Sequence, residues 1–121
     1  MRSFYGRFMI SRTLAKKIAK IANDHKAIDI KVLDLRKLTS FTDFFVICSG
    51  ASDRQVQAIA DSIHVNVKKL GRKPIGEEGL RGGSWALIDY GDVIAHVFYN
   101  EQRDYYQLDK LWGDAPIVKF E

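Results

Sequence analysis

"FFVICSGASDRQVQAIA", residues 44–60, predicts a buried strand followed at once by a capped helix. Phe44 to Cys48 are continuously apolar, which is typical of a central strand covered on both faces. Ser52 to Gln55 has the form of a capping box, and apolar residues then recur at helical spacing until Gly71. These recurring residues are Val56, Ile59, Ala60, Ile63, Val67 and Leu70. A central strand of this kind requires helices packed on the sheet.

The residues before this stretch predict one helix and one strand. Apolar residues spaced i, i+4, i+7 and i+8 from Leu14 indicate an amphipathic helix, for which Ser11 is the expected cap. Ile28, Ile30 and Val32 alternate with polar residues, which indicates a strand with one wetter face.

The residues after it predict a hairpin and a last helix. The glycine-rich segment 71–83 is expected to be a connection with one short strand through Pro74-Ile75. Trp85–Asp89 and Val93–Tyr99 then form an antiparallel hairpin around Tyr90-Gly91. The last helix is predicted to end at Gly113 and to place four residues on one face. These four are Tyr105, Leu108, Leu111 and Trp112.

The predicted fold class is α/β, a mixed β-sheet flanked by helices. The chain has 121 residues, which suits a single domain. We expect that domain to span residues 13–116, after a basic N-terminal extension, 1–12, and before a C-terminal tail, 117–121.

Composition indicates a folded protein in a reducing compartment. Hydrophobic residues make up 46% and charged residues 28% of the chain. The net charge of +4 suits an anionic neighbourhood such as a nucleic-acid-rich particle, and it leaves direct RNA contact open. The single cysteine, Cys48, cannot close an intrachain disulfide, so a cytoplasmic location is expected. No run of ~18 apolar residues is present, so no membrane contact is expected.

The basic N-terminal segment allows two interpretations. Residues 1–23 hold six lysines and arginines and no acidic residue, which superficially resembles an organelle transit peptide. The interpretation we favour is a basic extension followed by the solvent-exposed face of a helix.

Enzymatic chemistry is weakly indicated. Gly50 lies between a strand and a helix, where backbone N–H groups can meet a phosphate, but the glycine motifs of nucleotide sites are missing. Asp89 and Asp92 are the nearest pair of carboxylates for metal-assisted nucleotidyl transfer, and they flank a turn instead of sharing a strand face. His25, His64 and His96 lie in separate elements, so no metal or other cofactor is predicted.

The hairpin allows two interpretations. His96 shares a strand face with Ile94 and Phe98, and both faces of that strand are apolar or aromatic. His96 is then a buried, hydrogen-bonded core residue, or the sheet face bearing it and Trp85 is left uncovered and binds a protein. Packing of Trp85 and Tyr99 within the core would remove the second interpretation. The basic stretch "VKKLGRK", residues 67–73, is interpreted as a solvated helix end, with nonspecific RNA contact as the alternative.

Four motifs together resemble the ribosomal silencing factor family, also called Iojap-like proteins. They are "DIKVLDLR", "TDFFVICSGASDRQVQAIAD", "WALIDYGDVIAHVF" and "RDYYQLDKLWGDA", and the likeness runs from about Leu14 to Pro116. The resemblance implies a fold related to nucleotidyltransferases without the catalytic carboxylates, so no enzyme activity is expected. It further implies binding to ribosomal protein L14 of the large subunit and steric blocking of subunit association, which represses translation under nutrient limitation.

The resemblance also assigns docking residues. Those matching the hairpin motif are Trp85, Asp89, Tyr90, Asp92 and His96, with the aspartates expected to pair with basic groups of the partner. Those matching the last-helix motif are Arg103, Tyr105 and Tyr106, and the alternative for Tyr105 or Tyr106 is packing of the helix onto the sheet. Peripheral contact with ribosomal RNA, a homodimer and a role in subunit assembly stay open. The alternative function is a nucleotide-binding or nucleotidyltransferase-like enzyme that uses Gly50, Asp89 and Asp92.

Overall fold

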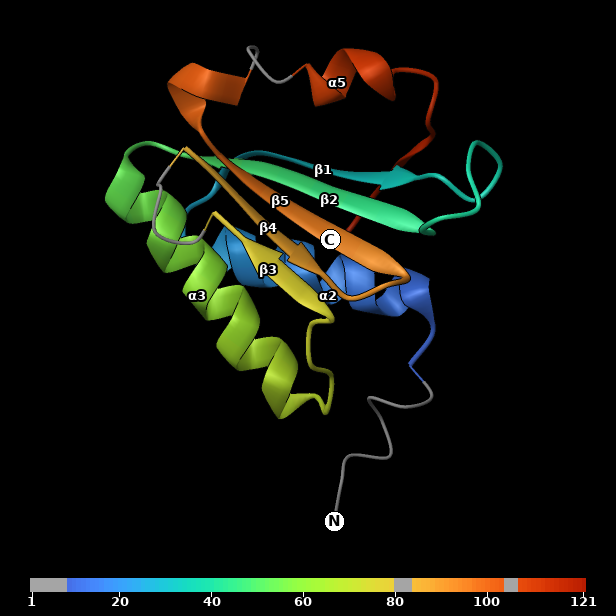
Figure 1. Ribbon diagram of the computed structural model, residues 1–121, viewed down its shortest axis with the longest axis horizontal. Coiled ribbons are helices and arrows are strands. Elements are labelled where there is room, and N and C mark those ends of the chain that lie inside the picture. Colours follow the sequence, from blue (N-terminus) through green and yellow to red (C-terminus); the bar gives the residue numbers. More distant parts are fainter. Residues whose placement is uncertain (1–8, 80–83, 104–106) are drawn as a thin grey trace.

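The computed structural model describes residues 9–79, 84–103 and 107–121 as one mixed sheet with helices on it (Figure 1). Within these ranges, six strands lie in the order β3-β4-β5-β2-β1-β6. Only β2 and β5 pair in parallel, and the other neighbours are antiparallel, so the predicted α/β class is confirmed. The elements are α2 (Ser11–Asp24), β1 (Ile28–Asp34), β2 (Phe44–Gly50), α3 (Asp53–Lys69), β3 (Gly76–Glu78), β4 (Trp85–Asp89), β5 (Val93–Tyr99), the 3-10 helix η1 (Asn100–Gln102), α5 (Leu108–Leu111) and β6 (Ile117–Val118).

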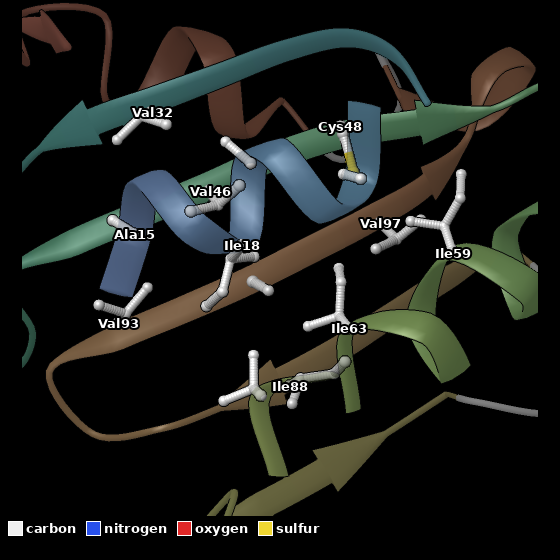
Figure 2. Close-up of a cluster of buried hydrophobic side chains, with 14 of the residues drawn as sticks. Ala15, Ile18, Val32, Val46, Cys48, Ile59, Ile63, Ile88, Val93 and Val97 are labelled. Carbon is white, nitrogen blue, oxygen red and sulfur yellow. The ribbon is translucent and has the colours of Figure 1, made fainter. Parts of the chain in front are cut away.

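The two long helices, α2 and α3, cover one face of the sheet, which we call the helix face (Figure 1). Ile18 of α2 and Ile59 and Ile63 of α3 point toward Val46 and Val97 of the central strands (Figure 2). All five side chains are buried, because each helix turns its apolar stripe to the alternating residues of β2 and β5. This layer is the larger part of the core.

The second face of the sheet has a different cover. Short α5 and the segment after it lie on this side, opposite α2 and α3 (Figure 1). Every residue of β2 is buried, so the predicted central strand covered on both faces is confirmed. The buried residues of this smaller core are Leu33, Leu35, Phe45, Ile47, Ile94, Phe98 and Ala115.

The N-terminal cap predicted from the sequence is confirmed for α3 and is wrong for α2. The Ser52 hydroxyl accepts a hydrogen bond from the Gln55 N–H at 3.1 Å, so the predicted cap of α3 is confirmed. The predicted cap of α2 is wrong: Ser11 is already helical, and the capping position belongs to Ile10, which offers no side-chain hydrogen bond. Helix α2 therefore begins inside the segment 1–12 that the sequence separated from the domain.

Two further elements differ from the prediction. The short strand in the glycine-rich connection is Gly76–Glu78 and not Pro74-Ile75, since proline has no N–H to give to a sheet. Ile117–Val118, in the predicted tail, pairs with β1 as an edge strand.

The last helix is shorter than its pattern suggested. Gln107 adopts a left-handed φ of 57°, and α5 spans only the four residues after it. Leu111 is 70% exposed, so it does not share a buried face with Leu108 and Trp112, and Tyr105 lies outside the described residues. No helix within the described ranges is long and apolar enough to cross a membrane.

Candidate docking face

The hairpin of β4 and β5 is the predicted one, residue for residue. Its turn uses Gly91 at a φ of 90°, where a side chain would be strained, and the Gly91 N–H donates to Asp89 Oδ1 at 2.7 Å. Trp85 pairs with Phe98 and Leu87 pairs with His96. These residues lie on the second face, because Phe98 belongs to its core and side chains alternate along each strand.

Aromatic rings form a continuous row across this second face. Trp85 lies 5.1 Å from Phe98, measured between ring centroids, and 5.8 Å from His96. His96 in turn lies 4.5 Å from Phe45, edge to face. Trp112 stands 5.8 Å beyond Phe45, and Phe41, which is 56% exposed, stands 6.1 Å beyond Trp112. The row begins at half-buried Trp85 on β4 and ends in a cluster of three rings, because Phe41 also lies 6.2 Å from Phe45.

His96 is a core residue that orients Trp85. The histidine is 3% exposed, and its Nδ1 accepts a hydrogen bond from Trp85 Nε1 at 3.2 Å. This bond places the ring proton on Nε2, which has no partner among the described residues. Burial lowers the pKa of His96 to about 3, so the ring is neutral near pH 7. The interpretation of His96 as a buried, hydrogen-bonded histidine is confirmed, and its bond to Trp85 connects it to a partly exposed residue.

The two aspartates are engaged separately in the turn. Asp89 Oδ1 closes the turn on Gly91, whereas Asp92 Oδ1 pairs with Arg72 Nη2 at 2.7 Å. Arg72 also donates to the carbonyl oxygen of Tyr90, so the loop after α3 is fastened to the hairpin. The carboxylates do not converge on a common point.

Besides His96, two more of the predicted docking residues have buried side chains. Tyr90 is 3% exposed and belongs to the core of the helix face, and its burial raises the pKa of its hydroxyl. Arg103 is 5% exposed, and its Nη1 donates to the Asp29 carbonyl oxygen at 2.7 Å and to Ser49 Oγ at 2.9 Å. Arg103 therefore fastens the irregular start of β1 to the end of β2. Tyr105 and Tyr106 lie outside the described residues.

The residues of the alternative enzyme site are not brought together. Because Phe44 pairs with Val93 and Gly50 pairs with Tyr99, Gly50 and the Asp89–Asp92 turn lie at opposite ends of the strands, about 20 Å apart. A Cβ at Gly50 would lie 2.8 Å from the Val56 nitrogen, so glycine is needed there for close packing of β2 on α3. The structure therefore gives Gly50, Asp89 and Asp92 no common site for a nucleotide.

Other chemistry is equally unsupported within the described ranges. No group of three or more His, Cys, Asp or Glu side chains there is placed to hold a metal ion. Burial raises the pKa of the Cys48 thiol to about 12, so Cys48 is an inert core residue.

Sequence reasoning did not single out Leu87 and Glu78. Leu87 lies between Trp85 and Asp89 on the second face, a position that period-two alternation along β4 indicates. Glu78 pairs with Leu87 across the β3–β4 ladder, and no sequence pattern fixed that register. Together with Gly79, Ser84 and Trp85 they line a pocket of about 240 Å³.

The chain is similar to proteins named ribosomal silencing factors and to Iojap proteins. Residues 9–121 match the family described as "Ribosomal silencing factor during starvation". "Ribosomal silencing factor RsfS" of Bacillus subtilis is 41% identical over 113 residues, which cover 93% of this chain and 96% of that protein. "Protein Iojap, chloroplastic" of Zea mays is 36% identical over 88% of this chain and 46% of its own length.

A solved structure shows the same fold. The crystal structure of a Chromobacterium violaceum protein superposes with a TM-score of 0.84 at 40% sequence identity, and covers 87% of this chain and 88% of the other. The arrangement of strands and helices described above is therefore one that a relative adopts in a crystal.

Proposed function

The chain belongs to the ribosomal silencing factor family, and from that premise we propose that it binds the large ribosomal subunit through ribosomal protein L14 and thereby blocks joining of the small subunit. Translation is repressed because joined ribosomes do not form. The proposal names the β3–β4 end of the second face as the docking face, with Trp85 and Leu87 at its centre.

The observation that carries the proposal is the half-buried Trp85 on the second face of the sheet. Its indole is held by Phe98 and by the hydrogen bond to His96, so the ring is already fixed before a partner arrives. Tryptophans that are partly exposed yet rigid are the usual anchors of protein interfaces, since little side-chain entropy is lost on binding. Leu87 extends the apolar area and Asp89 supplies a polar rim.

The remaining predicted docking residues act from beneath this surface. In the proposal His96 orients Trp85, Tyr90 supports the turn from the helix face, and Asp92 and Arg103 fasten neighbouring segments. Tyr105 and Tyr106 stay in the proposal as docking residues of the segment before α5.

The mechanism is steric and requires no bond to be made or broken. A folded chain of 121 residues has a radius of gyration of about 14 Å. A body of that size on the face of the large subunit that meets the small subunit holds the two apart. We accordingly propose a protein that is not an enzyme and that acts in the cytoplasm.

Contact with ribosomal RNA is secondary in this proposal. Lys68, Lys69 and Lys73 are exposed around the end of α3, on the helix side of the sheet and away from Trp85. Cations there add a salt-dependent attraction to the particle without setting the docking geometry.

The experiment is a binding measurement with separated ribosomal subunits and with isolated protein L14. We expect the chain to sediment with large subunits, to stay behind when only small subunits are present, and to bind isolated L14. Sedimentation with small subunits, or binding to large subunits without any affinity for L14, would contradict the proposal.

A further inference from the structure

We propose that the pocket between β3 and β4 receives a lysine or arginine side chain of the ribosomal partner, and that Glu78 supplies the carboxylate that pairs with it. The inference rests on the proposed function, because it places one more contact on the same docking face. Glu78 is not among the residues that the family motifs single out.

The pocket is sized for a side chain. Its volume of about 240 Å³ is below the range of about 300–1,000 Å³ that is typical of sites for small molecules. Trp85 and Leu87 provide apolar walls, and Glu78 and Ser84 provide the polar ones. A long basic side chain matches this lining, since its methylene stem packs on apolar groups while its charged end reaches a carboxylate.

Backbone geometry fixes Glu78 beside Trp85. Gly79 has a φ of 74°, and a Cβ built on it would lie 1.9 Å from the Trp85 carbonyl oxygen. The end of β3 therefore approaches β4 more closely than any residue other than glycine allows. Glu78, the residue before it, faces the same side as Leu87, its partner in the ladder.

The charge of the pocket is uncompensated by its described lining. The Glu78 side chain is exposed and forms no ion pair or hydrogen bond with the described residues, and the pocket lining they provide contains no lysine or arginine. Its neighbour Glu77 differs: it faces the other side, where its Oε1 lies 2.8 Å from His64 Nδ1 in a pocket that Lys68 and Lys73 also line. Among the described residues, the Glu77 carboxylate therefore has a basic partner and the Glu78 carboxylate has none.

A cation in this position gains two attractions. It meets the carboxylate of Glu78, and it lies within reach of the Trp85 ring, the side chain most favourable for cation–π contact. A phosphate backbone would be repelled by the same carboxylate. The charge therefore favours a basic protein surface over RNA as the occupant.

The test compares Glu78→Gln and Glu78→Lys with Glu77→Gln, a matched control that makes the same charge change on the opposite face of the same strand. Affinity for purified large subunits is measured for each variant at low and moderate salt. We expect Glu78→Gln to weaken binding by about tenfold, Glu78→Lys to weaken it further, and Glu77→Gln to stay within about twofold of wild type. The salt dependence should be shallower for Glu78→Gln, because one ion pair is missing.

Three results would overturn the inference. If both Glu78 variants bind with wild-type affinity, no basic side chain of the partner occupies the pocket. If Glu78→Gln and Glu77→Gln lose affinity equally, the effect belongs to β3 as a whole. Loss of self-association in Glu78→Gln with unchanged subunit binding would make the pocket a contact between two copies of this chain. If wild type itself fails to bind large subunits, the proposed function is wrong, and that outcome is seen before any variant is compared.

Discussion

At the scale of single residues, the second face shows how a buried polar side chain can orient a partly exposed one. His96 is buried among aromatic rings, keeps a neutral ring, and uses one nitrogen to hold the Trp85 indole. Burial without a hydrogen bond to Nε2 costs stability. The hydrogen bond from Trp85 to Nδ1 is the one polar contact of the ring that the described residues provide.

The neutral His96 predicts a pH-dependent stability. Its pKa is about 3 in the folded chain against 6.5 as the ordinary value, so between these values the unfolded chain binds a proton that the folded chain does not. The free energy of unfolding therefore falls as the pH drops through this window, by up to about 1.4 kcal/mol per pH unit from this group. Urea unfolding from about pH 7 to about pH 4.5 measures the effect.

The comparison for that prediction is His96→Asn. The asparagine amide oxygen takes the place of Nδ1 as acceptor for Trp85, and the amide does not titrate. We expect wild type to lose about 2 to 3 kcal/mol more than the variant over that pH range, since only wild type must exclude a proton. Parallel pH curves for the two proteins would show that His96 is not the group responsible.

At the scale of elements, the two long helices differ in how they begin. Ser52 caps α3 through its hydroxyl, whereas Ser11 lies inside the first turn of α2 and caps nothing. Ser52→Ala should lower the free energy of unfolding by about 1 kcal/mol, because the Gln55 N–H loses its acceptor. Ser11→Ala is the matched control and should change it by less than about 0.5 kcal/mol. Chemical denaturation of both variants checks this, and equal losses would contradict the assignment of the caps.

At the scale of the whole molecule, the sequence predicted the elements whose pattern is continuous. The pattern is an unbroken apolar run in β2, a helical spacing of apolar residues in α3, and two apolar runs on either side of Tyr90-Gly91 in the hairpin. β3 and β6 are only three and two residues long, and they exist as strands because longer neighbours offer them hydrogen bonds. A pattern that short carries no period from which to predict a strand.

The docking face was predictable in part for the same reason. Trp85, Leu87 and Asp89 alternate along one strand, so their common face follows from the sequence. That His96 is covered, that Arg103 is buried between β1 and β2, and that Glu78 stands beside Trp85 all depend on register and on packing between distant segments. Such contacts are set by tertiary structure, which a single sequence does not display.

Sedimentation of ribosomal subunits with wild type and with Trp85→Ala, while Mg²⁺ is raised to drive association, tests the central claim most directly. We predict that wild type travels with the large subunit and that the joined particle fails to form. Trp85→Ala should weaken binding by ~2 kcal/mol or more, about 30-fold, so that joined particles form at the same protein concentration while the variant still unfolds cooperatively. The account would be contradicted if wild type stayed at the top of the gradient, or if Trp85→Ala blocked joining as well as wild type does.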